Sequence, residues 1–308
     1  MLGICCQFLE QKRSKNGTTT YVNVIGERSL QVNRLRRGDY DEDKIRSTYV
    51  TNINNLIRII PCLSRQGFRL FRLSSALFPL SDLVDRSLWD NVDTRKLLKQ
   101  LGNIIRDHGM RVGTHPGQFC VLSSDSASVV EKSITELELH GWMFDVMELP
   151  RTVEFSINIH GGKRGRSSAL THQILALNPS VRSRLTLEND ESSYSVTDLI
   201  HVYKATGVPI VFDSHHHKFN DGYLTVDEAF EAACATWPQG IVPLQHISNS
   251  EPGCGSSRLE RRKHSFMIHE VPQCQLLAVR ENRIALECEA KGKNVAIIEM
   301  SKQFAISM

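Results

Sequence analysis

The sequence predicts a (β/α)₈ barrel, an α/β fold in which eight parallel strands alternate with helices. The chain has 308 residues, and such a barrel needs roughly 250. Short apolar, β-branched runs alternate with segments of helical periodicity, and eight strand–helix pairs can be counted. No shift in composition indicates a domain boundary, so we expect one domain over residues 1–308.

The expected strands are short and mostly apolar, as in sheets that are covered on both faces. They lie at residues 2–6, 69–74, 111–114, 152–159, 184–188, 209–213, 241–247 and 283–289. Residues 7–40 are polar and carry turn signals at Asn16-Gly17 and Arg37-Gly38-Asp39. We therefore expect an insertion loop there, with a small hairpin near residues 19–25.

Helical periodicity and turn residues place a helix after each of the later strands. The expected helices are residues 43–66, 93–108, 126–147, 168–177, 195–206, 226–236, 260–270 and 294–304. We expect Pro61 to interrupt the first of them and Pro272 to end the seventh. Asp125, Ser126 and Ser128 are possible N-caps of the third.

Composition sets limits on partners and compartment. The net charge is only +3, so overall charge does not announce a polyanionic partner. None of the eight cysteines forms a Cys-x-x-Cys pair, and we expect reduced thiols in an intracellular, cytoplasmic or nucleus-associated protein. No window approaches 18 apolar residues, so no membrane partner is expected. The local basic groups are each more typical of a solvated surface than of a phosphate contact: Lys12/Arg13/Lys15, Arg34/Arg36/Arg37, Lys163/Arg164/Arg166 and Arg258/Arg261/Arg262/Lys263.

Histidines and carboxylates recur at the ends of the expected strands. Because active sites of such barrels lie at the C-terminal strand ends, these side chains can converge although they are far apart in sequence. Imidazole and carboxylate are usual ligands of zinc, manganese and iron. There are more donors than one ion can use, which favours a two- or three-metal centre acting on a phosphodiester. The strand-end residues are His115, His160, Glu188, Asp213, His246 and Glu289.

Two histidines outside the strands can each be interpreted in two ways. His216 belongs to the run His215–His217 and follows Asp213 by three residues, which suits a metal ligand, although a hydrated histidine-rich turn has the same sequence. His264 lies off the strands and, taken alone, is as well explained as a surface histidine. Glu188 to Glu191 also reads as an acidic loop, in which only Glu188 lies at a strand end.

The segment after His115 predicts a contact with nucleic acid. Pro116-Gly117 would turn the chain and project Gln118 and Phe119, a pair suited to wedging into a base stack. The alternative is that Phe119 caps the barrel. After His160, two glycines precede Lys163, Arg164 and Arg166, which could take backbone phosphates. This is neither a Walker loop nor a dinucleotide fingerprint, so no nucleotide cofactor is expected.

Several of these segments closely resemble the UV damage endonuclease family, relatives of endonuclease IV among the sugar-isomerase-like barrels. They span nearly the whole chain in order. They are residues 71–75 (FRLSS) with Pro79, 114–119 (THPGQF), 159–162 (IHGG), 187–191 (LENDE), 212–217 (FDSHHH), 245–248 (QHIS), His264 and 289–293 (EAKGK).

The resemblance implies a nuclease that cuts duplex DNA immediately 5′ to UV photoproducts and leaves a 3′-hydroxyl. It implies two or three divalent ions, manganese above all, with zinc or magnesium as substitutes, in a protein expected to be a monomer. It makes Gln118 and Phe119 the pair inserted at the lesion. Glu188, His246 and Glu289 are the catalytic candidates. The implied metal ligands are His115, His160, Glu188, Asp213, His216, His246, His264 and Glu289.

Three positions depart from the family pattern. Members often carry a lysine, carboxylated in some, two residues before the position of His246; here Leu244 stands there. Gly3-Ile4 replaces a common Gly-Tyr, and Phe266 stands where an acidic residue is common. Leu244 keeps open a metal-deficient protein that marks damage without cutting. An abasic-site endonuclease and a sugar isomerase or epimerase on the same barrel also stay open.

Overall fold

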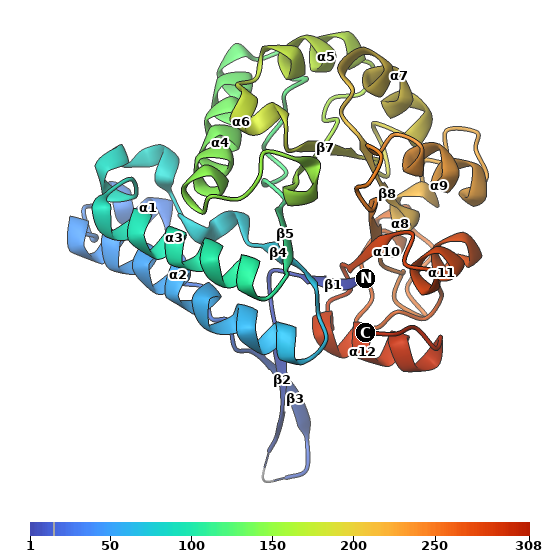
Figure 1. Cartoon of the computed structure of the whole chain (residues 1–308), viewed down its shortest axis with the longest axis horizontal. Helices are drawn as coiled ribbons and strands as arrows, with labels where there is room; N and C mark the ends of the chain where they lie inside the picture. The colour runs from blue at the N-terminus through green and yellow to red at the C-terminus, as the bar shows by residue number, and fades with distance from the viewer. Residues whose placement is uncertain (15) are drawn as a thin grey trace.

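Eight parallel strands close into a barrel in the computed structural model, which describes residues 1–14 and 16–308. Around the barrel the order is β1-β10-β9-β8-β7-β6-β5-β4, so strands that are neighbours in the barrel are successive barrel strands in the sequence (Figure 1). The expected (β/α)₈ fold is confirmed. The strands are β1 (Leu2–Cys5), β4 (Leu70–Leu73), β5 (Arg111–Thr114), β6 (Ile157–His160), β7 (Leu185–Glu188), β8 (Ile210–Asp213), β9 (Leu244–Ile247) and β10 (Ala285–Cys288).

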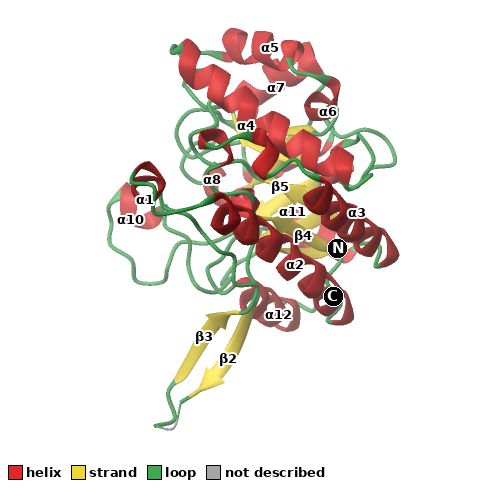
Figure 2. Cartoon of the chain, turned by 90° about the vertical axis from the view of Figure 1, so that its left-hand side faces the viewer, coloured by secondary structure: helices red, strands yellow, loops and turns green. Residues whose placement is uncertain are grey.

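Helices surround the strands on the outside of the barrel, as Figure 2 shows. Most begin and end within two residues of the expected positions. They are α2 (Glu42–Arg65), α3 (Val92–Asp107), α4 (Ala127–Val146), α5 (Ser167–Ala176), α6 (Pro179–Arg182), α7 (Val196–Thr206), α8 (Ser214–His217), α9 (Val226–Cys234), α10 (Arg258–Arg261), α11 (Gln273–Arg280) and α12 (Lys293–Gln303).

The expectation that Pro61 interrupts its helix is wrong, because α2 continues through Pro61 to Arg65. A proline inside a helix removes a hydrogen bond and costs about 3 kcal/mol. The flanking side chains of Ile59, Ile60 and Leu63 are buried in the core, and the burial of such a side chain contributes about 1.5–3 kcal/mol. Packing therefore outweighs the local penalty.

The expected helix over residues 260–270 is also wrong. Only Arg258–Arg261 is helical there, and Pro272 precedes α11 as its N-cap rather than ending a helix. The side chain of Asn249 accepts hydrogen bonds from the backbone N–H groups of His269 (2.6 Å) and Glu270 (3.2 Å). Because a side chain from the loop after β9 accepts from these two N–H groups, they do not require the backbone hydrogen bonds of a helix.

The fourth strand begins later than expected. Residues Val153–Phe155 form a 3-10 turn, and β6 starts only at Ile157. The alternation of apolar residues in this segment resembles a strand, yet Val153 packs into a buried apolar cluster with Leu244 and Trp237 instead. The pattern therefore indicated burial correctly and backbone conformation wrongly.

The insertion after β1 contains a hairpin and a short helix, but the expected hairpin within residues 19–25 is wrong, because residues 19–23 form only the second of its two strands. Strands β2 (Leu9–Arg13) and β3 (Thr19–Asn23) pair antiparallel, and α1 spans Val32–Arg36. The hairpin projects from the barrel in both views (Figures 1 and 2). Lys15, which the sequence grouped with Lys12 and Arg13, lies outside the described residues.

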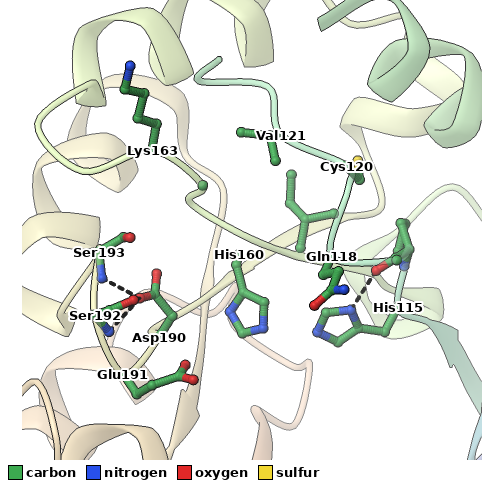
Figure 3. A pocket seen from close by; sticks show the side chains of 14 residues that line it. His115, Gln118, Cys120, Val121, His160, Lys163, Asp190, Glu191, Ser192 and Ser193 are labelled. Carbon is green, nitrogen blue, oxygen red and sulfur yellow. Dashed lines mark hydrogen bonds between the residues drawn. The ribbon is translucent and has the colours of Figure 1, made fainter. Parts of the chain in front are cut away.

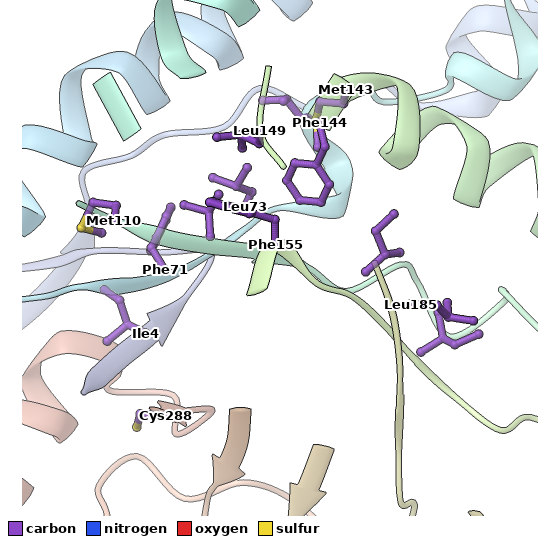
Figure 4. Packing of buried hydrophobic residues seen from close by; sticks show 14 of the residues in the cluster. Ile4, Phe71, Leu73, Met110, Met143, Phe144, Leu149, Phe155, Leu185 and Cys288 are labelled. Carbon is purple, nitrogen blue, oxygen red and sulfur yellow. The ribbon is translucent and has the colours of Figure 1, made fainter. Parts of the chain in front are cut away.

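The core has two parts. The larger lies between strands and helices, where Phe71 and Leu73 of β4 and Phe144 of α4 are buried (Figure 4). The smaller consists of Leu70, Val153, Val211, Trp237, Leu244 and Ala285, and we call it the apolar plug. Strand side chains alternate between faces, so Val211, Leu244 and Ala285 share the inner face with Asp213, His246 and Glu287. The plug therefore fills the barrel at the inner-face position that lies two residues before Asp213, His246 and Glu287 on their strands.

All eight cysteines are unpaired in the part of the chain that the structure describes. Across these same residues, no helix combines the length and the apolar character that crossing a bilayer would require.

Candidate metal centre

Eight histidine and carboxylate side chains meet at the C-terminal end of the barrel. Among the described residues they form three groups whose potential ligand atoms lie within 4.8 Å of one another. The groups are His115/His160/Glu188, His216/His264/Glu289 and Glu188/Asp213/His246/Glu289. Every residue predicted as a ligand from the sequence belongs to one of them. Glu188 and Glu289 each belong to two, so the groups are contiguous rather than separate.

Glu188, the last residue of β7, is the hub of this arrangement. Its Oε2 lies 3.0 Å from Nε2 of His115, and its Oε1 lies 3.0 Å from Nδ1 of His246 and 3.4 Å from Nδ1 of His216. The residue is fully buried. A buried carboxylate needs compensating positive charge, and here three imidazoles surround it, one from the loop after β5, one from α8 and one from β9.

A short polar chain fixes the orientation of Glu188. The amide of Asn158 donates to Glu188 Oε2 at 2.6 Å, and the hydroxyl of Thr186 donates to Asn158 Oδ1 at 2.8 Å. Asn158 lies two residues before His160 on β6, and Thr186 two residues before Glu188 on β7. Neither residue was predicted to belong to the site, although residues two apart on a strand point to the same face, which would have placed Asn158 beside His160 and Thr186 beside Glu188.

Asp213 links the end of β8 to a single helical turn. Its Oδ1 accepts hydrogen bonds from the backbone N–H groups of His215 (2.7 Å) and His216 (2.8 Å), so it is the N-cap of α8. This places the His216 ring beside Glu188 and leaves Nδ1 2.9 Å from the carbonyl of Asn189. Oδ2 of Asp213 is buried without a hydrogen-bond partner among the described residues.

The histidine run is not a hydrated turn, because His215, His216 and His217 are all buried. His216 faces the site. His215 packs edge-on against His264, with ring centroids 5.4 Å apart, and His217 packs against Phe212 in the core. His264 is partly buried and its Nδ1 lies 3.9 Å from Glu289 Oε2, so the surface interpretation of this residue does not hold.

Charge coupling displaces several pKa values. Burial favours the neutral form of Glu188, but His246 and His160 outweigh it and hold the pKa of Glu188 well below its usual value. Burial lowers the pKa of His246, yet the Glu188 carboxylate outweighs that effect and raises it to about 9. The pKa of His216 is raised well above normal, where Asp213 and Glu188 overcome burial. Burial lowers the pKa of His160.

The residues fit divalent cations. Buried polar atoms are almost always hydrogen-bonded, yet Asp213 Oδ2 and His160 Nδ1 find no partner in the described part of the chain, and each residue belongs to one of the donor groups. Mixed imidazole and carboxylate donors suit zinc, manganese or iron. Carboxylates shared between adjacent groups are the arrangement that holds neighbouring ions together.

Two further charged residues lie within this end of the barrel. Arg72 of β4 pairs with Glu287 of β10 and, at 2.6 Å, with Glu289. Neither Arg72 nor Glu287 was predicted to have a role from residue type and spacing. Leu244, where the resemblance leads one to expect lysine, is buried in the apolar plug.

A cavity of about 370 Å³ opens beside His115 and His160. Figure 3 shows these two rings next to each other, with Gln118 above His115 and with Asp190 and Glu191 beyond His160; the ring centroids are 5.1 Å apart. Asp190 accepts from the backbone N–H groups of Ser192 and Tyr194, so it shapes the loop rather than the donor groups.

Gln118 lines this cavity and Phe119 follows it on the surface. The Phe119 ring is 80% exposed. An apolar cap of the barrel would be buried, so that alternative does not fit the structure. Large exposed aromatic side chains commonly mark a binding surface.

The three basic residues after His160 lie on the surface, and one of them borders the same cavity. Lys163 lines it and pairs with Asp125, which Arg166 also contacts at 3.0 Å. Arg164 donates to the carbonyl of Ser192 across the opening. All three cations are exposed, but part of their charge is neutralised by the one carboxylate.

Comparisons with known proteins support a nuclease of the kind that the residues resemble. The sequence profile of the family described as UV-endonuclease UvdE matches residues 15–307. A UV DNA damage endonuclease of Nostoc sp. (strain PCC 7120) is 35% identical over 305 residues, covering 96% of this chain and 88% of that protein. One of Deinococcus radiodurans is 36% identical over 263 residues, covering 83% of each.

Solved structures share the barrel. The crystal structure of SacUVDE matches with a TM-score of 0.78 at 21% identity and covers 99% of both chains. Endonuclease IV from Thermus thermophilus matches with a TM-score of 0.55 at 13% identity, over 81% of this chain and 94% of that one. At these identities the likeness concerns the fold.

Proposed function

This chain belongs to the UV-endonuclease UvdE family, and we propose that it is a metal-dependent DNA repair endonuclease. The proposed reaction is a nick in duplex DNA immediately 5′ to a cyclobutane pyrimidine dimer or a 6-4 photoproduct, with a 3′-hydroxyl left at the nick. One observation carries the proposal: three donor groups share Glu188 and Glu289 beside a cavity that the exposed Lys163 lines.

Two or three divalent ions, manganese above all, with zinc or magnesium as substitutes, are the proposed cofactors. Bound divalent ions supply Lewis-acid stabilisation of the attacking and leaving oxygens of a phosphodiester. Glu188, His246 and Glu289 are the proposed catalytic residues, because Glu188 and Glu289 each belong to two donor groups and His246 lies beside both carboxylates. Asn158 and Thr186 hold Glu188 in place through hydrogen bonds.

Damage recognition is assigned to Gln118 and Phe119. A distorted duplex is easier to unstack than an intact one, so an inserted ring selects lesions by deformability. The exposed Phe119 ring can stack on a base without first leaving a packed position. The adjacent Gln118 amide can hydrogen-bond to exposed base edges.

Backbone contacts are assigned to Lys163, Arg164 and Arg166. All three are exposed, and Lys163 lines the cavity, so they suit phosphates on either side of the lesion. Because Asp125 pairs with two of them, we expect fewer released counterions than three free cations would give.

A nicking assay tests the proposal. Supercoiled plasmid, irradiated or not, is incubated with the protein after EDTA treatment and again after adding Mn²⁺. We expect nicks only in irradiated DNA and only with added metal. Cutting in EDTA would contradict metal dependence, and equal cutting of both plasmids would contradict lesion selectivity. An oligonucleotide with one thymine dimer then maps the nick, which should lie at the phosphodiester 5′ to the lesion.

The same oligonucleotide format separates the competing substrates. A duplex with one abasic site in place of the dimer should be cut more slowly; faster cutting would favour an abasic-site endonuclease. Binding of irradiated duplex without any cutting, in protein shown to hold metal, would favour a protein that marks damage. A sugar epimerase would show no salt-sensitive affinity for DNA.

Replacing Gln118 tests the wedge. Gln118→Ala should lower the preference for damaged over intact duplex by about 5–10-fold, the value of roughly one hydrogen bond, with little change in thermal stability because the side chain is exposed. Competition binding with irradiated and intact oligonucleotides measures this preference. Gln239→Ala, an exposed glutamine in the loop before β9, is the matched control. Full discrimination by Gln118→Ala would show that the wedge assignment is wrong.

A further inference from the structure

A run of basic residues between β9 and β10 has no part in the proposed function. Arg258 and Arg261 belong to α10, and Arg262 and Lys263 follow them. In Figure 2, α10 lies at the end of the barrel opposite the marked termini, among the loops that follow the strands. His264, a member of one donor group, is the next residue. The run therefore lies beside the metal centre and not on a remote face.

The loop that follows β7 separates this run from the cavity beside the metal centre. Glu191 and Ser192 of that loop line the cavity. Arg258 donates to the carbonyl of Glu191 at 2.6 Å, and Arg164 donates to the carbonyl of Ser192. Arg164 follows β6 and Arg258 follows β9, and β7 lies between these two strands in the barrel. Two basic groups that are far apart in the sequence therefore flank a single loop.

Arg258 keeps most of its hydrogen-bond donors available. Its two hydrogen bonds, to the carbonyls of Glu191 and Phe219 (2.9 Å), both use one terminal nitrogen. A guanidinium has five N–H donors, so Nε and the other terminal nitrogen are left for a ligand. Both partners are neutral, and Arg258 forms no ion pair with the described residues, whereas its neighbour Arg262 pairs with the Glu191 carboxylate. The charge of Arg258 is therefore not compensated by a carboxylate.

Arg261 is held by an aromatic ring. Its guanidinium carbon lies 5.8 Å from the centre of the Phe219 ring, and its side chain forms neither a hydrogen bond nor an ion pair with the described residues. A cation over an aromatic ring is attracted to it, so the ring orients Arg261 without using a donor. The acidic residue of α10, Glu260, accepts from the hydroxyl of Ser257 instead. A side chain that is already oriented loses less conformational entropy on binding.

We propose that α10 is a second contact surface for the DNA backbone. Arg258 and Arg261 bind phosphates on one side of the nick, and the basic residues after β6 bind phosphates on the other side. The loop that follows β7 lies between the two contacts. A guanidinium offers a phosphate two parallel N–H groups, which the ammonium of lysine does not. The inference rests on the proposed function, because it concerns how the same site holds its substrate.

The first test is the salt dependence of DNA affinity, measured by fluorescence anisotropy with a dimer-containing duplex. Arg261→Ala in the full chain should weaken binding a few-fold and reduce the slope of log affinity against log salt by about one. Arg261→Lys keeps the charge, so most of the slope should return. Arg182→Ala, at an exposed arginine shortly before β7 and so at the opposite end of the barrel, should leave the slope unchanged.

Two failures of this test are distinguishable. Equal salt slopes for Arg261→Ala and Arg182→Ala, in protein that still binds the duplex, would overturn the role of α10 and leave the proposed function standing. If the unaltered protein has no salt-dependent affinity for DNA, the proposed function fails, and this inference fails with it.

A second measurement begins with the unaltered protein and shows which phosphates are bound. Duplexes carry neutral methylphosphonates in place of phosphates on one side of the dimer or on the other, and each set should weaken binding. In Arg261→Ala the substitutions on one side should lose part of their effect, and in Lys163→Ala those on the other side should. Loss on the same side in both variants would contradict two opposite contacts, as would a response of the unaltered protein to one side only.

Discussion

The two ends of the barrel interior use the same strands for opposite purposes. On β8, Val211 precedes Asp213 on the inner face, and on β9 Leu244 precedes His246. The earlier residue of each pair packs into the apolar plug and the later one joins the donor groups. Two residues along a strand span only about 6.6 Å. The residues that stabilise the barrel interior are thus only two positions away, along the same strands, from the residues of the proposed metal centre.

Each end also treats charge differently. Beside the plug, Arg111 donates to the carbonyls of Val242 (2.6 Å) and Glu154 (3.0 Å) and packs against the Trp237 ring, while burial lowers its pKa to about 10. At the other end, burial is overcome by Glu287 and Glu289, which raise the pKa of Arg72. Arg111 is satisfied by neutral backbone carbonyls, whereas Arg72 pairs with two carboxylates at the metal-binding end of the barrel.

The largest expected effect concerns Glu188. Glu188→Gln should slow nicking of dimer-containing DNA by on the order of 10³-fold, because several kcal/mol of charge stabilisation are lost. The melting temperature of the metal-free variant should fall, because His246 and His216 lose the buried carboxylate that compensates their charge. Single-turnover nicking and thermal unfolding measure the two properties. Nicking within tenfold of the unaltered rate would contradict the role of Glu188 as the hub.

The opposite result is expected in the plug. Leu244→Ala should lower the free energy of unfolding by about 2–5 kcal/mol, as buried leucine-to-alanine changes do, and should leave nicking at low temperature within a few-fold. Denaturant unfolding and nicking well below the melting temperature measure the pair. Leu244→Met, which keeps the volume, should cost less than about 1.5 kcal/mol. A large loss of nicking activity in folded Leu244→Ala would contradict the view that the plug contributes to stability and not to the reaction.

Metal affinity should rise with pH. The pKa of His246 is raised to about 9 and that of His216 is raised well above normal, so both imidazoles are protonated near neutrality and must release a proton to bind metal. Mn²⁺ affinity should therefore increase from pH 6.5 toward pH 9, by up to about tenfold per pH unit for each proton released. Competition titration with a chelator of known pH dependence checks this. An affinity independent of pH would contradict the coupling to the carboxylates.

The smallest effect is expected at the rim. Lys163→Ala should weaken DNA binding by a few-fold and reduce the dependence of log affinity on log salt by about one or less, because Asp125 already pairs with the lysine. Fluorescence anisotropy at several salt concentrations measures the slope. Lys204→Ala, an exposed lysine on α7, should leave it unchanged. Equal salt slopes for the two variants would show that Lys163 does not contact DNA phosphates.

The strand ends could be predicted from the sequence because parallel strands bring their C-termini together whatever the exact boundaries. His160, Asp213 and Glu289 therefore met as expected although β6 begins later and β10 is shorter than predicted. Helix boundaries at Pro61 and Pro272 failed because local rules cannot weigh the burial of α2 or the hydrogen bonds that Asn249 offers.

Glu287 and Asn158 were missed for a different reason. Both lie inside strands, where a polar residue surrounded by apolar ones has no turn signal beside it. Their contacts depend on which residue faces them from another strand, such as Arg72 of β4 for Glu287 of β10 and Glu188 of β7 for Asn158 of β6. That relation depends on the stagger of the strands, which a sequence pattern does not contain.

Asp213 has a consequence for how this site can change over time. One of its oxygens caps α8, and the other is buried with no hydrogen-bond partner among the described residues, so the start of the helical turn and a proposed ligand belong to the same side chain. Lengthening it to glutamate would shift the helical turn and His216 together. We therefore expect that tolerated substitutions at Asp213 and His216 occur together. A library that varies either residue alone should return almost no active clones.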